Sequence, residues 1–200
     1  MSRIVLATTS RYKRALFEKL GLPFTTAAPP FEEVIDPEEE PRQLAINLAV
    51  GKARSLSDRF PDATIIGADQ ILAHRGTMLT KPGTVDKTLE QLLRLRGSTH
   101  QLHTAFAIHQ PRQNRLITGC DTSTLSMHDH LSKTFLKQMV MEDETWDCVG
   151  GYKYESKGIF LFKAIAAEDP NAIVGLPLLS LVRELQTLGF FPGRFEPGST

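Results

Sequence analysis

The stretch from residue 63 to residue 70 constrains the fold most, because it has the composition of a strand buried inside a sheet. Apolar and β-branched residues dominate positions 63–66, and the small residues Gly67 and Ala68 precede the acid Asp69. We expect the strand to end in a turn at these small residues. In open α/β sheets, ligands bind where strand ends leave the core. Asp69 is therefore a candidate for chemistry; the alternative is that it caps a turn or the next helix.

Strand and helix patterns alternate in the first half of the chain, and hairpin patterns dominate the middle. Apolar spacing predicts strands at residues 4–7, 102–109, 116–127 and 159–165. Helical spacing and capping residues predict helices at 11–20, 38–56, 85–94, 132–141 and 177–188. A turn at residues 74–77 should return Lys81 toward Asp69. Together these patterns predict an α/β fold in which helices flank a mixed, twisted sheet.

Composition narrows the class of protein. The chain has 200 residues and 41% hydrophobic content, which suits one domain over residues 1–190, with 191–200 as a Gly- and Pro-bearing C-terminal tail. Its 23 basic and 23 acidic residues balance. The sequence has no long basic run of the kind that would predict nucleic-acid binding. We also expect no signal peptide and no membrane span. Cys120 and Cys148 are too few for a disulfide framework, which favours a reducing, cytoplasmic location.

The turn after the first strand is suited to binding a small anion. Thr8 and Ser10 are candidate caps for the helix at residues 11–20. The first-turn amides and the positive end of the helix dipole attract phosphate, and Lys13 and Arg14 add mobile positive charge. Many ordinary helices also begin this way, so the turn by itself is a weak signal.

Lys52 is expected to point inward from the second helix. The apolar positions of that helix occupy one half of its circumference, and Lys52 falls at about 80° from Leu44, near the middle of that half. Burying an unpaired ammonium would cost several kcal/mol. A carboxylate or an anionic ligand would remove this cost. The alternative is that Lys52 extends out along its stem to reach solvent.

Several motifs in order resemble those of the Maf family of nucleotide pyrophosphatases. They are residues 6–10, Glu33, Lys52, residues 67–70, Lys81-Pro82, residues 150–155 and residues 174–177. The resemblance covers almost the whole chain. It implies a fold similar to that of inosine triphosphate pyrophosphatases, and hydrolysis between the α- and β-phosphates of a nucleoside triphosphate. It also implies a divalent metal, Mg²⁺ or Mn²⁺, and a small nucleotide as the partner; a homodimer is left open.

The resemblance assigns roles to particular residues. Asp69 would be the general base, and Glu33 with Asp69 would hold the metal. The residues implied to contact the substrate phosphates are Thr8, Ser10, Lys13, Lys52 and Lys81. Without the family, Glu33 would read as a solvated loop acid and Lys81 as a surface turn residue.

Three positions correspond to those that set base preference in the family: Tyr12, Gln70 and Glu155. They resemble the branch that acts on 7-methyl-GTP. A cationic 7-methylguanine would stack on Tyr12, and Glu155 would accept hydrogen bonds from its N1 and N2 donors. Alternatively, Tyr12 is a boundary aromatic residue and Glu155 a surface acid.

Two departures bear on affinity and base preference. Arg11 stands where the family usually has proline, and Tyr12 replaces the tryptophan usual in this branch. Two other functions stay open. One is the branch of the family that hydrolyses dTTP and UTP. The other is a non-catalytic nucleotide-binding regulator of septum formation.

Overall fold

One mixed sheet organises the fold. The computed structural model describes residues 3–192, in which seven strands form a single sheet. The strands are β1 (Ile4–Ala7), β2 (Phe24–Ala27), β3 (Thr64–His74), β4 (Thr77–Leu79), β5 (Thr99–Gln110), β6 (Arg115–Met127) and β7 (Phe162–Ala166). Their order is β2-β1-β3-β5-β6-β7, with β4 pairing the far end of β3. β1 runs parallel to β2 and β3, and the other pairs are antiparallel. The predicted mixed α/β fold is confirmed.

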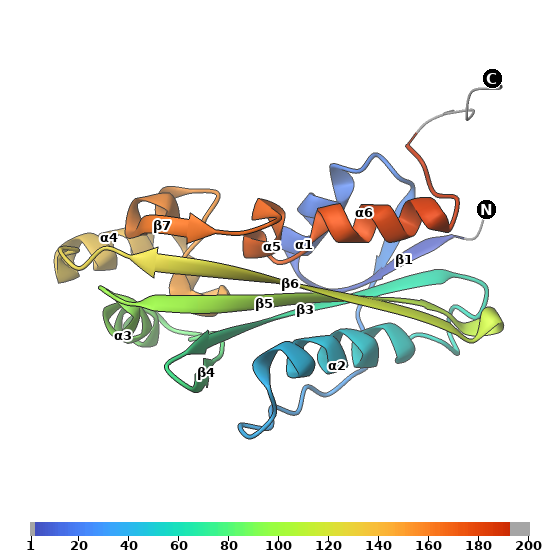
Figure 1. Cartoon of the computed structure of the whole chain (residues 1–200), viewed down its shortest axis with the longest axis horizontal. Coiled ribbons are helices and arrows are strands. Elements are labelled where there is room, and N and C mark those ends of the chain that lie inside the picture. The colour runs from blue at the N-terminus through green and yellow to red at the C-terminus, as the bar shows by residue number, and fades with distance from the viewer. Residues whose placement is uncertain (1–2, 193–200) are drawn as a thin grey trace.

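Helices cover both faces of this sheet (Figure 1). The α-helices are α1 (Arg11–Glu18), α2 (Pro41–Arg54), α3 (Val85–Leu95), α4 (Lys133–Asp143), α5 (Pro170–Val174) and α6 (Leu178–Thr187). Short 3-10 turns are η1 (Pro111–Gln113), η2 (Thr145–Asp147), η3 (Val149–Gly151) and η4 (Lys157–Leu161). Helix α2 lies on one face, α1, α5 and α6 lie on the other, and α3 and α4 lie at the far end of the long strands. Within residues 3–192, no helix has the length and apolar character that crossing a membrane requires.

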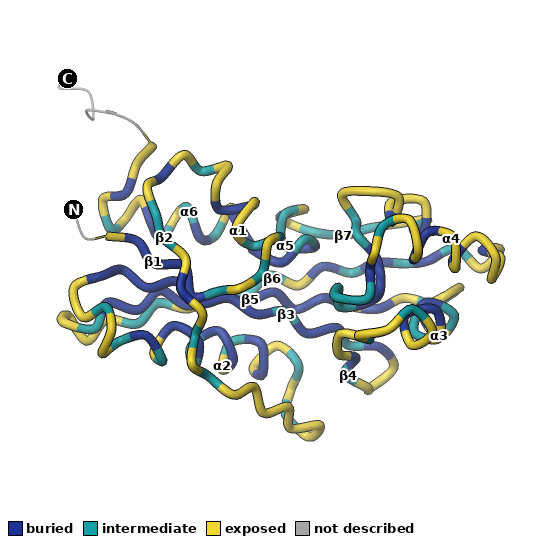
Figure 2. The backbone as a smooth tube through the Cα atoms, turned by 180° about the vertical axis from the view of Figure 1, so that it is seen from behind, coloured by how far each residue is buried: buried dark blue, intermediate teal, exposed yellow. Residues whose placement is uncertain are grey.

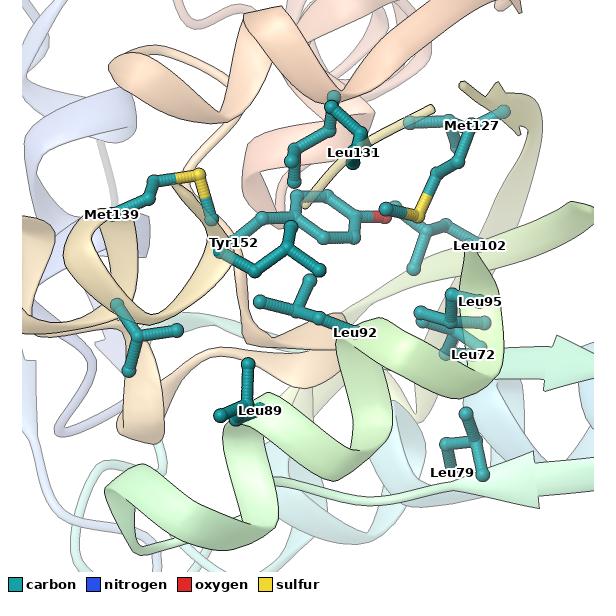
Figure 3. Packing of buried hydrophobic residues seen from close by; sticks show 14 of the residues in the cluster. Leu72, Leu79, Leu89, Leu92, Leu95, Leu102, Met127, Leu131, Met139 and Tyr152 are labelled. Carbon is teal, nitrogen blue, oxygen red and sulfur yellow. The ribbon is translucent and has the colours of Figure 1, made fainter. Parts of the chain in front are cut away.

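The core follows the alternation of side chains along the strands. Ile65 and Ile66 are both fully buried, but Ile65 packs in the α2 layer and Ile66 in the layer of α1 and α6. Figure 2 shows β1, β3 and β5 as buried over most of their length. At the far end, Leu92 of α3 and Leu131 lie around the ring of Tyr152 (Figure 3). Apolar burial on both faces explains why β1 and the first part of β3 have few polar residues.

The prediction that the strand ends at Gly67 and Ala68 is wrong, because β3 continues without a break to His74. A small residue is required at position 67 because a helix packs against it, and not because the chain turns there. A Cβ atom on Gly67 would lie 2.1 Å from the carbonyl oxygen of Ala49 and 2.8 Å from the amide nitrogen of Ala53. The backbone of α2 therefore lies directly against β3. This close approach brings the end of α2 next to Asp69.

One edge of β3 is nonetheless open around Asp69. β1 pairs with β3 only as far as Gly67, and β4 begins to pair at Leu72. On the opposite edge, Asp69 pairs with Ala105 of β5. The gap between β1 and β4 thus exposes backbone groups of β3 in the middle of the sheet. Asp69 therefore lies in the interior of a strand and not at its end.

The hairpin that returns the chain from β3 to β4 matches the prediction at residues 74–77. Arg75 and Gly76 both have positive φ, 50° and 74°. Two such residues in succession form the type of tight turn that suits the twist of a two-stranded hairpin. Lys81 lies two residues after the end of β4 and lines the same cleft as Asp69.

Other elements differ from the sequence-based expectations. The sequence patterns do not predict β2, an edge strand of four residues, or the short helix α5. The strand expected at residues 159–165 is partly wrong, because η4 precedes β7 and Phe160 is 68% exposed. The amide of Gly158 donates to the carbonyl of Lys153, which bends this segment. Most of the predicted tail, residues 193–200, lies outside the described residues.

Candidate active site

A cleft of about 560 Å³ opens at the gap in the β3 edge. Its walls come from the turn before α1, the loop after β2, the end of α2, the middle of β3, the segment after β4, the η2–η3 region and the end of α5. Every residue to which the family resemblance assigns a role in the site lines it: Thr8, Ser10, Tyr12, Lys13, Glu33, Lys52, Asp69, Gln70, Lys81 and Glu155. The fold thus brings together segments that are far apart in the chain.

Asp69 is held firmly at the floor of the cleft. The residue is only 8% exposed. Its Oδ2 accepts a hydrogen bond from Lys52 Nζ at 2.9 Å, and its Oδ1 accepts one from the amide of Gln70 at 2.8 Å. Asp69 caps no helix, so the capping alternative is wrong. A carboxylate has about four lone-pair sites, so both oxygens keep the capacity to accept a further hydrogen.

Lys52 points inward, as its position on the apolar face of α2 predicts, and its ammonium lies between two carboxylates. Its Nζ is 2.7 Å from Glu33 Oε1 and 2.9 Å from Asp69 Oδ2. Burial lowers the pKa of Lys52, but the charges and hydrogen bonds of Asp69 and Glu33 outweigh burial and raise the pKa overall. The ammonium therefore stays charged inside the site. The alternative that Lys52 extends out to solvent is wrong, because the residue is 9% exposed.

Glu33 reaches the site from the loop between β2 and α2. Its side chain is 48% exposed, yet it pairs with the buried ammonium of Lys52. Phe31 anchors the same loop, since its ring lies so close to Gly51 that a Cβ there would be 2.3 Å from the ring. A glycine on α2 thus makes room for the aromatic side chain that positions the Glu33 loop.

Lys13 adds a second buried ammonium from α1. Its Nζ donates to the carbonyl oxygen of Ala68 at 2.9 Å, on the open edge of β3, and lies 3.9 Å from Asp69 Oδ1. Burial lowers the pKa of Lys13 to about 8, and the attraction of Asp69 offsets only part of this effect, while the nearby Lys52 and Lys81 lower it further. Three cations, Lys13, Lys52 and Lys81, thus face two carboxylates, Asp69 and Glu33, and this excess of positive charge favours a phosphate ligand.

The turn before α1 has the capping geometry that the sequence predicts. The Thr8 hydroxyl accepts from the amide of Ser10 at 3.0 Å, and the Ser10 hydroxyl accepts from the amide of Lys13 at 3.4 Å. Both residues line the cleft. Arg14, by contrast, pairs with Glu18 at 2.9 Å and is not part of the lining. Arg14 therefore contributes no charge at the cleft wall.

Gln70 uses its amide nitrogen within the protein. Its Nε2 donates to the Thr104 hydroxyl and to the carbonyls of Ala172 and Ile173, at 2.9, 2.9 and 3.1 Å. These bonds tie β3 to α5. With the nitrogen occupied, the Oε1 is the atom of this amide suited to meet a ligand, and it can only accept hydrogen bonds.

Tyr12 also lines the cleft, next to Lys153 of the 150–155 motif and to Asp147, which the sequence did not single out. Its hydroxyl donates to Asp147 Oδ1 at 3.1 Å. Lys153 Nζ lies 5.6 Å from the ring centre and also donates to the carbonyl of Asp143. Asp147 is 135 residues from Tyr12 in the chain, and no local pattern marks it. Only the packing of η2 beside α1 reveals it.

The donor set fits a divalent cation that is shared with a substrate. Within residues 3–192, no cluster of three or more His, Cys, Asp or Glu side chains could hold a metal ion. Glu33 and Asp69 nevertheless place two carboxylates beside one ammonium. Mg²⁺ commonly uses one or two protein carboxylates and completes its shell with water and phosphate oxygens. The two acids suit that arrangement.

Comparison with known proteins gives consistent matches along the chain. A family model described as Maf, Maf-like protein, matches residues 3–188. A relative in Aromatoleum aromaticum named 7-methyl-GTP pyrophosphatase is 41% identical over 189 residues, covering 94% of this chain and 96% of the relative. A protein of the same name in Xanthomonas axonopodis is 40% identical over 190 residues, covering 95% and 98%. Another in Hahella chejuensis is 40% identical over 187 residues, covering 93% and 94%.

Proposed function

Because this chain belongs to the Maf family, we propose that it is a nucleoside triphosphate pyrophosphatase that converts 7-methyl-GTP to 7-methyl-GMP and pyrophosphate. The main support from the geometry is Lys52, buried between Glu33 and Asp69 at the floor of the cleft. A site that only bound nucleotide would need the cations but not a fixed acid pair. The names of the relatives support 7-methyl-GTP as the substrate.

At the phosphate end, the ammonium groups of Lys13, Lys52 and Lys81 would stabilise the charge of the triphosphate. Asp69 would accept a proton from the water that attacks the α-phosphorus, and pyrophosphate would leave in line with the attack. Glu33 and Asp69 would hold the divalent cation, which supplies further charge stabilisation when bound. The hydrogen bonds from Lys52 and from the Gln70 amide fix the orientation of the Asp69 carboxylate.

At the base end, a cationic 7-methylguanine would stack on the ring of Tyr12. The N1 and N2 donors of the base would find acceptors in Glu155, which lines the cleft, and in Gln70 Oε1. A uracil or thymine edge offers one such donor and no positive charge. This arrangement favours the methylated purine over the pyrimidines.

A substrate comparison tests the proposal. With Mg²⁺ and with Mn²⁺, we expect kcat/KM to be highest for 7-methyl-GTP, lower for GTP, and lowest for UTP and dTTP. Pyrophosphate and the nucleoside monophosphate should form in equal amounts, which separates cleavage at the α-phosphate from loss of the γ-phosphate. Faster turnover of UTP or dTTP would place the protein in the pyrimidine branch instead.

The lowered pKa of Lys13 gives a second prediction. The ammonium binds phosphate only when charged, so kcat/KM should fall as pH rises through about 8, the pKa of Lys13 in the free enzyme. Arginine stays charged far above this pH. In Lys13→Arg, we expect the alkaline fall of kcat/KM to move to higher pH, whatever the change in its maximum. The measurement is a kcat/KM profile from pH 6 to pH 10 for both proteins. An unchanged alkaline limb would show that another group titrates there.

A reducing, cytoplasmic location is part of this proposal, and the free thiols of Cys120 and Cys148 are compatible with it. A homodimer stays a prediction that sedimentation or light scattering of the purified protein would test.

A further inference from the structure

Three residues in the part of the cleft proposed to bind the nucleobase form a cluster that the phosphate chemistry does not use. Arg11 Nη2 donates to the Tyr12 hydroxyl at 2.8 Å, and the Tyr12 hydroxyl donates to Asp147 at 3.1 Å. Arg11 Nη2 also lies 3.6 Å from Asp147 Oδ2, and the guanidinium carbon lies 4.9 Å from the centre of the Tyr12 ring. All three residues line the cleft. A cation thus contacts both an aromatic ring and a carboxylate at the place proposed for the base.

The guanidinium group resembles the edge of guanine. Both present adjacent N–H donors on a planar carbon–nitrogen frame, and 7-methylguanine, like arginine, carries a positive charge. The partners of Arg11, an aromatic ring and a carboxylate, are therefore the partners that such a base requires. On the basis of the proposed function, we infer that Arg11 is a built-in occupant of the base subsite. The incoming base displaces it, and Asp147 then accepts the N1 and N2 donors of the base.

Arg11 is the cation of this region that can leave easily. Its side chain is 63% exposed and that of Asp147 is 44% exposed, and ion pairs this exposed are weak. Within residues 3–192, Tyr12 and Asp147 are the side chains that Arg11 contacts by hydrogen bond or ion pair. Lys153 also approaches the ring, but the carbonyl of Asp143 anchors its ammonium. A base that stacks on Tyr12 would therefore exchange with Arg11.

The inference adds Asp147 to the acceptors that select the base. Glu155 lines the cleft, but within the described residues no hydrogen bond or ion pair positions it. Asp147 is held by the Tyr12 hydroxyl, at the rim of the ring on which the base would stack. A carboxylate already fixed next to the stacking surface loses less conformational freedom on binding.

Binding measurements with two variants test the inference. The probes are 7-methyl-GTP, UTP and inorganic triphosphate, which has no base, in buffer with EDTA so that no turnover occurs. Arg11→Gln should tighten 7-methyl-GTP about threefold, because no side chain then competes for the subsite, and should leave inorganic triphosphate unchanged. Asp147→Asn should weaken 7-methyl-GTP at least fivefold, with little change for inorganic triphosphate.

Matched controls come from exposed residues outside the cleft. Arg14→Gln removes a charge three positions further along α1, and Asp129→Asn removes an exposed acid. Neither should change any of the affinities. Thermal unfolding of all four variants checks that they remain folded.

Two results would overturn the inference. If Arg11→Gln weakens 7-methyl-GTP and inorganic triphosphate by the same factor, Arg11 binds phosphate and does not occupy the base subsite. If Asp147→Asn changes all three affinities equally, Asp147 does not read the base. A different result would contradict the proposed function: the wild-type protein would bind and hydrolyse UTP better than 7-methyl-GTP.

Discussion

Replacing Asp69 by asparagine is expected to lower kcat for 7-methyl-GTP at least 100-fold while changing the Kd of the nucleotide only a few-fold. A general base commonly contributes about 10²- to 10⁴-fold to a rate, and an amide cannot take the proton. Asparagine has the same shape, so its oxygen can keep one of the hydrogen bonds from Lys52 or the Gln70 amide. The cations that we propose to contact phosphate remain in place. Pyrophosphate release and calorimetric binding, measured on the same sample, separate the two effects.

The control for this variant is Asp62→Asn, which removes an exposed acid that pairs with Arg112 outside the cleft. It should keep full turnover. Undiminished pyrophosphate release by Asp69→Asn would exclude Asp69 as the base. The non-catalytic regulator makes a different prediction, because its wild-type form would bind nucleotide and release no pyrophosphate at all. The wild-type assay therefore decides between enzyme and regulator before any variant is made.

Replacing Gly67 by alanine is expected to lower the free energy of unfolding by about 3 kcal/mol, at the upper end of the range for overpacked cores. The added methyl would lie 2.1 Å from a carbonyl oxygen of α2, and no rotamer of a neighbour can relieve a clash with backbone. β3 cannot retreat, because β1 and β5 pair with it at Gly67 on both edges. The helix must move, and Lys52 moves with it. For a chain of this size, we expect Tm to fall by roughly 6 to 12 °C.

Gly76→Ala is the matched comparison for this variant. Gly76 has a φ of 74°, but a Cβ there meets nothing within 4 Å, so the substitution adds backbone strain without a clash. It should cost about 1 kcal/mol and leave turnover unchanged. Gly67→Ala should in addition lower kcat, because the ammonium of Lys52 would no longer reach both acids. Denaturant unfolding and steady-state kinetics of the two variants provide the measurements. Equal stability of Gly67→Ala and wild type would mean that α2 adapts without cost.

The fold was largely predictable where one element carries its own pattern. The apolar run at residues 4–7 and the capped helix at residues 85–94 lie within one or two residues of the observed elements. The predictions failed where tertiary context decides. Gly67 resembles a turn residue in isolation, and only the position of α2 shows why a small residue is needed there. Residues 159–161 are apolar, but the bend at Gly158 keeps them out of the sheet.

The inward direction of Lys52 could be predicted from the sequence, because helical spacing alone determines which way a side chain leaves its helix. The partners of Lys52 could not. Glu33 comes from a loop, and its approach depends on Phe31 packing against Gly51 of another element. The positions of Glu33 and Lys81 in the cleft agree with the resemblance, whereas their catalytic roles remain proposals.

By itself, the sequence determined the alternation of strands and helices, the buried face of α2 and the set of motifs that the family shares. These are properties of periodicity and residue order, which act within a few turns of chain. Only the tertiary structure decided that Asp69 lies inside β3 at a gap between β1 and β4, and that Asp147 meets Tyr12. Such contacts join residues that are distant in the chain, and their geometry depends on how whole elements pack, which no local pattern encodes.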